Sequence, residues 1–137
     1  MTLVDTFAAM STVVAIHALS AIGALLLGPL ALGLRKGTPG HRAAGYSWVL
    51  LMVMTAVSSL FIRDFRLPNV AGYTPIHIVT GVAFVGLGLG LWHVMHGNVR
   101  RHRRAMQITY GALVAAGALS LLPSRILGGF VWQQLPV

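Results

Sequence analysis

Two short segments, each opening on a glycine and leading to a histidine–arginine pair, organise this sequence. The first is GTPGHRAAG, residues 37–45, and the second is GNVRRHRRAM, residues 97–106. A run of ~20 apolar residues can cross the ~30 Å hydrocarbon core of a bilayer as a helix. Around the two segments lie four such stretches, at roughly residues 7–34, 44–62, 75–95 and 105–122. The sequence therefore predicts an all-α fold, a bundle of four transmembrane helices in one integral membrane domain, residues 1–137.

The composition supports a membrane protein and narrows its chemistry. Hydrophobic residues make up 56% of the chain and charged residues only 9%, which leaves too little polar surface for a soluble domain. The chain has no cysteine, so disulfides, thiolate metal sites and thiol redox chemistry are excluded. The first ten residues contain no Lys or Arg, so we expect the first apolar stretch to be retained and not cleaved as a signal peptide.

The positive charge is concentrated in two of the three connections. Seven of the ten basic residues lie in the first and third connections: Arg35, Lys36, Arg42, Arg100, Arg101, Arg103 and Arg104. The positive-inside rule then predicts that these connections are cytoplasmic and that both termini are outside. Arginines at such positions contact lipid phosphates. No interleaved aromatic residues accompany them, so the net charge of +8 does not indicate nucleic-acid binding.

The spacing of histidines around the two glycine segments reveals a repeat. His17 precedes Gly37 by 20 residues, and His77 precedes Gly97 by the same number. Downstream, a second histidine follows each glycine by four or five residues. We interpret the chain as two copies of a helix–turn–helix unit. Because each copy contains two spans, both copies enter the membrane in the same direction, as parallel repeats about an axis along the membrane normal.

The repeat predicts two pairs of facing histidines at different depths. His17 and His77 would meet near the outer side, and His41 and His102 near the inner side. Ionisable residues inside a membrane are costly and point to function. A single histidine of this kind could simply hydrogen-bond a neighbouring helix, but two symmetry-matched pairs favour a binding role.

A pair of imidazoles suits haem better than a bare metal ion. Zinc or copper usually recruits a third or fourth donor, and the spans contain no Cys, Asp or Glu. Haem iron needs only two axial ligands from the protein, and bis-imidazole ligation suits electron transfer. Small residues near the histidines would let a flat macrocycle approach, or equally a neighbouring helix backbone. These residues are Ala21, Gly28, Gly45, Gly81 and Gly88.

Several other side chains have two interpretations. Arg42 and Arg103 each follow an inner histidine, and their guanidinium groups would pair either with haem propionates or with lipid phosphates. His93 and His96 have no counterparts in the first half. His96 is assigned to the basic inner rim, and His93, inside its span, belongs either to that rim or to a site as a spare ligand or proton-transfer residue. Trp48, like Trp92 and Trp132, lies toward the end of its stretch, which is typical of an aromatic belt.

Three longer runs resemble a known family. They are HRAAGYSWVLLMVMTAVSSLFI (41–62), PIHIVTGVAFVGLGL (75–89) and HGNVRRHRRAMQITYGALVAAG (96–117). They resemble a bacterial family of small membrane proteins catalogued as domain of unknown function 2306. The histidine pattern is also similar to the cytochrome b561 superfamily, in which alternate helices hold two b-type haems near opposite membrane faces. That similarity implies His17 with His77, and His41 with His102, as axial ligands. The resemblance to the bacterial family implies a location in a bacterial inner membrane.

Three functional hypotheses follow. The first is a di-haem b-type cytochrome, a transmembrane oxidoreductase that carries electrons between quinol or quinone and a small-molecule donor or acceptor on the outer side. The second is a protein that binds or transports copper, zinc or protons through its histidines. The third is a structural accessory protein. All three contact membrane lipids, and none fixes the oligomeric state, so a homo-oligomer is left open.

Overall fold

The described part of the chain folds into four long helices and one short one. The computed structural model describes residues 4–5, 8, 11–63, 65 and 68–134. The helices are α2 (Thr12–Gly33), α3 (Pro39–Ser59), α4 (His77–Met95), α5 (Val99–Ser120) and α6 (Ile126–Gln134). The all-α bundle predicted from the sequence is confirmed, while the predicted start of the first stretch at residue 7 lies outside the described residues.

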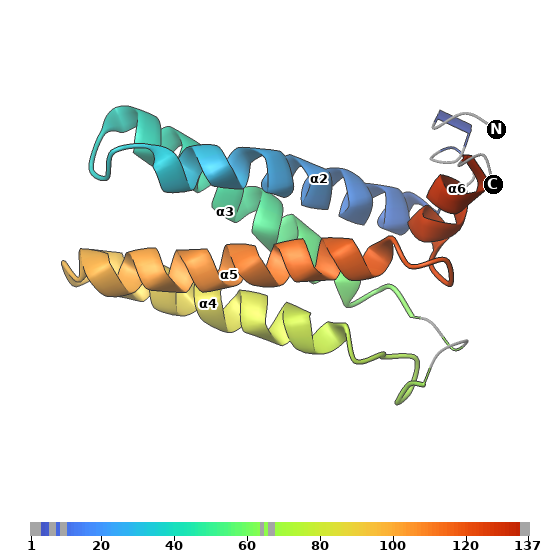
Figure 1. The fold of residues 1–137 in the computed structure, drawn as a ribbon. Helices are drawn as coiled ribbons and strands as arrows, with labels where there is room; N and C mark the ends of the chain where they lie inside the picture. Colours follow the sequence, from blue (N-terminus) through green and yellow to red (C-terminus); the bar gives the residue numbers. More distant parts are fainter. Residues whose placement is uncertain (1–3, 6–7, 9–10, 64, 66–67, 135–137) are drawn as a thin grey trace.

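The four long helices form two antiparallel hairpins. Helix α2 packs mainly on α3, and α4 packs mainly on α5. The hairpins meet where α2 lies against α5 and where α3 lies against α4, which leaves α2 diagonal to α4 and α3 diagonal to α5. Both tight connections lie at one end of the bundle, and α6 lies at the other (Figure 1). This is the arrangement of two parallel helix–turn–helix repeats.

The two tight connections are built in the same way. Each contains a glycine in the left-handed region, Gly37 with φ 83° and Gly97 with φ 72°. The next residue then caps the following helix: the Thr38 side chain accepts from the His41 amide, and the Asn98 side chain accepts from the Arg101 amide. These caps begin α3 and α5 several residues before their apolar stretches. The inner histidines therefore belong to first helical turns.

Among the described residues, two helices are long and apolar enough to cross a membrane, namely α2 and α4. Helices α3 and α5 reach similar lengths, but their first turns carry the charged residues of the connections. Large apolar side chains are widely exposed on the bundle, including Leu26 at 75% and Ile78 at 71%. Surfaces of this kind match a hydrocarbon environment better than water. That all four long helices cross the bilayer stays a prediction.

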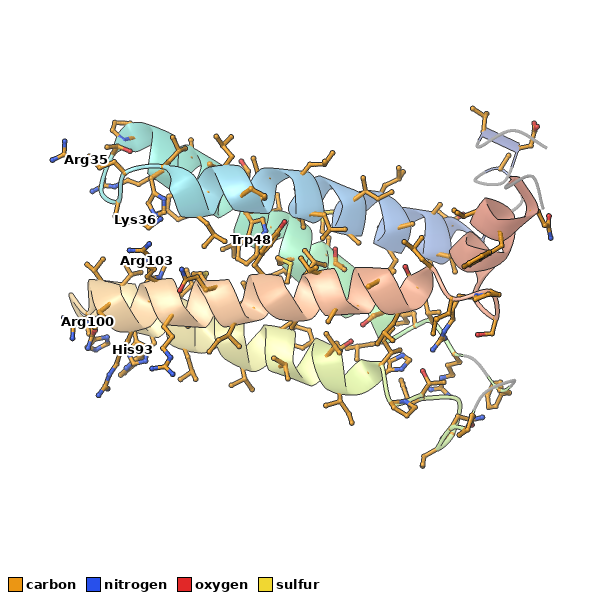
Figure 2. The ribbon with its side chains drawn as sticks, viewed as in Figure 1. Arg35, Lys36, Trp48, His93, Arg100 and Arg103 are labelled. Atoms are coloured by element: carbon orange, nitrogen blue, oxygen red, sulfur yellow. The ribbon has the colours of Figure 1, made fainter. Side chains whose placement is uncertain are left out.

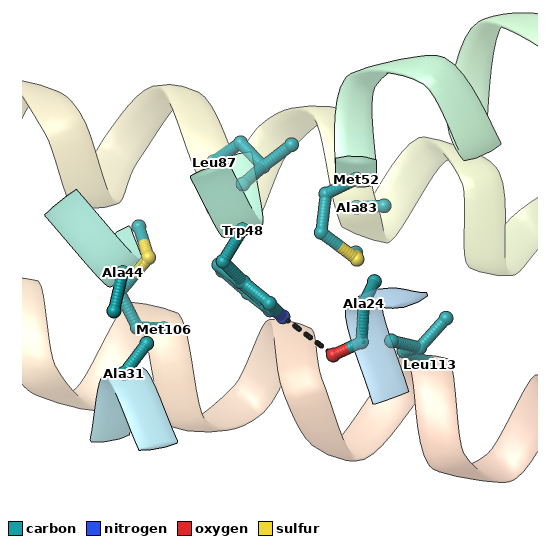
Figure 3. Close-up of a cluster of buried hydrophobic side chains, with 9 residues drawn as sticks. All are labelled: Ala24, Ala31, Ala44, Trp48, Met52, Ala83, Leu87, Met106 and Leu113. Carbon is teal, nitrogen blue, oxygen red and sulfur yellow. Dashed lines mark hydrogen bonds between the residues drawn. The ribbon is translucent and has the colours of Figure 1, made fainter. Parts of the chain in front are cut away.

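A small cluster of buried side chains joins the hairpins (Figure 3). Trp48 lies at its centre, only 3% exposed, and its indole Nε1–H donates to the Ala24 carbonyl at 3.1 Å. The prediction that Trp48 belongs to an aromatic belt is therefore wrong. A tryptophan can be buried at this depth because the indole N–H has a backbone partner. Trp92 and Trp132 are exposed, at 58% and 53%.

A tyrosine from the second hairpin fits into a notch on the first. Pro29 lies inside α2 and has no N–H, so the Leu25 carbonyl loses its helical donor. The Tyr110 hydroxyl of α5 donates to that carbonyl at 2.9 Å. Gly28 makes room, because a Cβ at this position would overlap the Tyr110 ring. This contact ties the two hairpins together beside the core cluster.

We expect Tyr110→Phe to destabilise the bundle by about 1–3 kcal/mol, because the Leu25 carbonyl would remain in an apolar interior without a donor. Unfolding in mixed micelles, followed by circular dichroism, measures the change. The matched control is Tyr46→Phe, since Tyr46 is 72% exposed. Equal stability of the two variants would show that the Tyr110 hydrogen bond does not hold the hairpins together.

Candidate functional site

The two inner histidines meet between diagonal helices. His41 comes from the first turn of α3 and His102 from the first turn of α5. Their ring centroids are 6.4 Å apart and the ring planes are nearly perpendicular, at 86°. Two imidazoles that share one metal ion through nitrogens at about 2.0–2.1 Å place their ring centroids roughly 6 Å apart. The centroid separation of the inner pair is therefore close to that of two imidazoles on opposite sides of one metal ion.

Hydrogen bonds to backbone carbonyls fix the orientation of both inner rings. His41 Nδ1 lies 2.9 Å from the Ala31 carbonyl, and His102 Nδ1 lies 2.8 Å from the Gly90 carbonyl. A carbonyl only accepts, so Nδ1 carries the proton in each ring. The lone pair of the neutral imidazole is then on Nε2. Metal-binding histidines are oriented by the same kind of bond.

The inner histidines line a cavity of about 380 Å³. This volume lies at the small end of the range for ligand and cofactor sites, about 300–1,000 Å³. The wall contains the core residues Trp48 and Met106 together with the apolar Leu91 and Val94. A flat apolar group could therefore enter between the hairpins at this end of the bundle.

Basic side chains surround this cavity and have no acidic residue near them in the sequence. Lys36, Arg42 and Arg103 all line it. Figure 2 shows Lys36 and Arg103 at the same end, one on each hairpin. Partial burial, and secondly the charge of Arg103, lower the pKa of Lys36. The sequence has only two acidic residues, and both lie outside the two tight connections. An anionic group bound here would relieve the repulsion between these cations.

The predicted small residues divide between different surroundings. Gly28 and Gly45 line the inner cavity, and a Cβ at Gly45 would meet no atom within 4 Å. Ala21 packs against the core cluster. Gly81 and Gly88 are exposed, with open space where a Cβ would lie. The structure thus brings two of the five predicted small residues to the inner histidines.

The outer histidines both bind the end of α3. His17 Nδ1 donates to the Thr55 carbonyl at 2.9 Å and lies 3.1 Å from Ser58 Oγ. His77 Nε2 donates to the carbonyls of Ser59 and Ile62, both at 3.1 Å. The rings belong to the diagonal helices α2 and α4, with α3 packed against both. At this level the histidines are held by backbone carbonyls of α3 and of the segment just after it.

The remaining nitrogen differs between the two outer histidines. His77 Nδ1 accepts from the Thr74 amide at 3.2 Å, so both of its nitrogens take part in hydrogen bonds. His17 donates a hydrogen bond through Nδ1, so its Nε2 carries the lone pair and is the nitrogen available to a metal. For His77 to bind a metal, it would have to exchange its bonds to α3 for the new ligand.

The two histidines outside the repeat lie on the outer surface of the second hairpin. His96 is exposed and stacks on Trp92, with ring centroids 4.0 Å apart. His93 lines a groove between α4 and α5 and does not line the inner cavity. Figure 2 shows His93 at the end of the bundle that holds the two basic connections, as predicted.

Comparison with known proteins assigns the family. The model of a family described as Predicted membrane protein (DUF2306) matches residues 14–134. The chain belongs to this family. No curated protein and no solved structure matches the chain. As a member of DUF2306, the protein is a helical membrane protein, which agrees with its apolar exposed surface.

Sequence reasoning missed Tyr110 and the capping role of Lys36 in this DUF2306 protein. Tyr110 links the two hairpins through its hydrogen bond to the Leu25 carbonyl. The Gly28–Pro29 pair in α2 is the sequence signal for that contact, because it leaves both a free carbonyl and space beside the helix. Lys36 donates to the Leu32 carbonyl at 2.7 Å and so satisfies the C-terminal end of α2. A lysine just after an apolar helix is a known signal for such capping.

The hydrogen bonds predict a different tautomer for His77 than for the inner histidines. In protein without added ligand at pH ~8.5, where imidazole is neutral, we expect Nδ1–H in His41 and His102 and Nε2–H in His77. Imidazole ¹⁵N chemical shifts, assigned with single His→Gln variants, distinguish these forms. Nε2–H tautomers in the inner pair would contradict the proposed orientation, since the lone pair would then be on Nδ1, which faces a backbone carbonyl, and not on Nε2.

Proposed function

We propose that this protein is a b-type membrane cytochrome that transfers electrons across the bilayer. One haem lies between His41 and His102, and a second lies between His17 and His77. The observation that carries the proposal is the inner pair: two rings 6.4 Å apart, each fixed through Nδ1 to a backbone carbonyl. Such a pair resembles bis-imidazole axial ligation.

The donor set at the inner site fits haem better than a bare ion. Among the described residues, no group of three or more His, Cys, Asp or Glu side chains gathers to hold a metal. Copper or zinc would need such additional donors. A porphyrin supplies four nitrogens itself, and the cavity beside the histidines is lined largely by apolar side chains. This contrast favours haem over the copper or zinc hypothesis.

When bound, haem supplies a one-electron iron couple with no open coordination position if both axial ligands are imidazoles. The protein's own part is to orient the two histidine rings and to keep water away from the bound group. The carbonyls of Ala31 and Gly90 hold the two rings and make them better donors. Arg42, Arg103 and Lys36 provide positive charge for the propionates at the cavity rim. Trp48 and Met106 limit the access of water from the bundle interior.

The outer site requires His77 to change its hydrogen bonds. His17 already points its Nδ1–H at α3, whereas His77 donates through Nε2 to Ser59 and Ile62. A second haem would bind once His77 Nε2 has broken its hydrogen bonds to those carbonyls. The inner haem does not depend on this change.

The proposed route for electrons follows from the two levels. About sixteen residues of α2 separate His17 from the tight connection, or roughly 24 Å of helix. Two sites at such different depths experience different fractions of the membrane potential. This suits electron transfer between a quinol or quinone and a small-molecule partner on the opposite face. The proposed location is the inner membrane of a bacterium, with both tight connections in the cytoplasm.

The first test is the haem content of the purified protein. We expect the sharp visible bands of low-spin haem b on reduction and two haems per chain by pyridine haemochrome. The double variant His41→Ala/His102→Ala should lose the inner haem and retain about one, and His17→Ala/His77→Ala should lose the outer haem. His96→Ala is the control, because its exposed ring stacks on Trp92 away from the cavity.

Two outcomes would overturn the proposal. A colourless, folded protein that copurifies with stoichiometric copper or zinc would favour the metal-binding alternative. An inner double variant that keeps the full haem content would show that His41 and His102 are not ligands. One haem per chain, lost only in the inner double variant, would confirm the inner site and remove the outer one.

The orientation is tested separately. Because seven basic residues lie at the end that holds both tight connections, we expect this end to be cytoplasmic and both termini to be outside. A cysteine introduced at the C-terminus should react with a membrane-impermeant maleimide in spheroplasts, and one introduced at the exposed Gly40 in the first connection should not. The reverse labelling pattern would invert the orientation.

A further inference from the structure

A second cavity lies on the surface of the second hairpin, away from the inner site. It is a groove of about 680 Å³ between α4 and α5. None of its lining residues lines the inner cavity. Its wall is apolar along most of its length, with Val82, Val85 and Leu89 contributed by α4. Val85 is 61% exposed and Leu89 49%, so the groove opens toward the surroundings of the bundle.

Charge is confined to one end of this groove. His93 from α4 and Arg101 and Arg104 from α5 line it there. They belong to the end of the bundle that holds the tight connections, where Figure 2 shows His93 close to the basic turn of α5. From Ile78 to His93 the groove follows about four turns of α4, or roughly 22 Å. One leaflet of hydrocarbon, about half of ~30 Å, fits within this length.

We propose that this groove binds one anionic phospholipid. Its phosphate contacts Arg101 and Arg104, His93 donates a further hydrogen bond, and one acyl chain lies along Val82, Val85 and Leu89. Two guanidinium groups match a phosphate through paired N–H donors. Basic pockets between membrane helices bind anionic headgroups in the same manner. A quinone fits less well, because its neutral ring gains little from two permanent cations.

The shape of the groove supports a chain-like occupant. Gly81 and Gly86 line it, so two positions on α4 contribute no side chain to the wall. A Cβ at Gly81 would meet no atom within 4 Å, whereas one at Gly86 would overlap the Thr109 side chain. Gly81 therefore borders open space in the groove, and a larger residue there would fill it without disturbing the protein.

This proposal does not rest on haem binding.

The test compares lipid binding by matched variants. Delipidated protein is titrated with phosphatidylglycerol, and bound lipid is counted by native mass spectrometry, with phosphatidylcholine as the zwitterionic reference. We expect one phosphatidylglycerol per chain in preference to phosphatidylcholine. Arg101→Gln/Arg104→Gln should weaken that binding by about tenfold or more. The control Arg35→Gln/Arg100→Gln removes the same charge from exposed positions outside the groove and should change binding less than about twofold.

A second pair of variants tests the acyl-chain path. Gly81→Leu should reduce phosphatidylglycerol binding without loss of helix content. Gly111→Leu adds the same side chain on α5, at another open position outside the groove. This control should leave phosphatidylglycerol binding unchanged. Equal losses in both arginine doubles would indicate general charge attraction and overturn the site. Equal binding of the two lipids, or displacement of phosphatidylglycerol by a short-chain quinone, would overturn it as well.

Discussion

The contact between Tyr110 and α2 determines how the two hairpins fit together. Pro29 removes one backbone donor from α2, and the Tyr110 hydroxyl supplies the missing hydrogen bond to Leu25. Gly28 allows the aromatic ring to approach, and Trp48 lies next to it with ring centroids 6.5 Å apart. Each hairpin alone could form from its tight turn. Only a contact between hairpins can place α5 so that His102 meets His41 across the bundle.

The inner and outer histidine pairs occupy different positions in their helices. The inner rings lie in first turns that follow a left-handed glycine and a capping residue, and each bonds to the preceding helix of its own hairpin. That local geometry fixes the ring whatever the other hairpin does. The outer rings bond to α3, and for His77 this contact crosses from one hairpin to the other. The orientation of each inner ring is therefore fixed within its own hairpin, whereas His77 uses its Nε2 in the packing between hairpins.

The sequence predicts the repeat, the two hairpins and the diagonal relation of the histidine-bearing helices, because these follow from spacing and symmetry alone. It does not predict how far each helix is rotated about its own axis. Most of these helices are apolar all round, so no polar face marks which side is buried. For this reason the sequence predicts a belt position for Trp48, which is buried, and a position beside the histidines for Gly88, which is exposed. The hydrogen bonds of His77 could not be predicted either, since they depend on where α3 ends.

The angle between the inner rings provides the most direct measurement of the central claim. The two imidazole planes are 86° apart, so ferric haem held between them would have nearly perpendicular axial ligands. The measurement is the low-temperature electron paramagnetic resonance spectrum of the ferric His17→Ala/His77→Ala variant, in which only the inner site can bind haem. The account predicts the strongly anisotropic low-spin signal that perpendicular imidazoles produce. A high-spin signal, or the less anisotropic low-spin signal of parallel imidazoles, would contradict it.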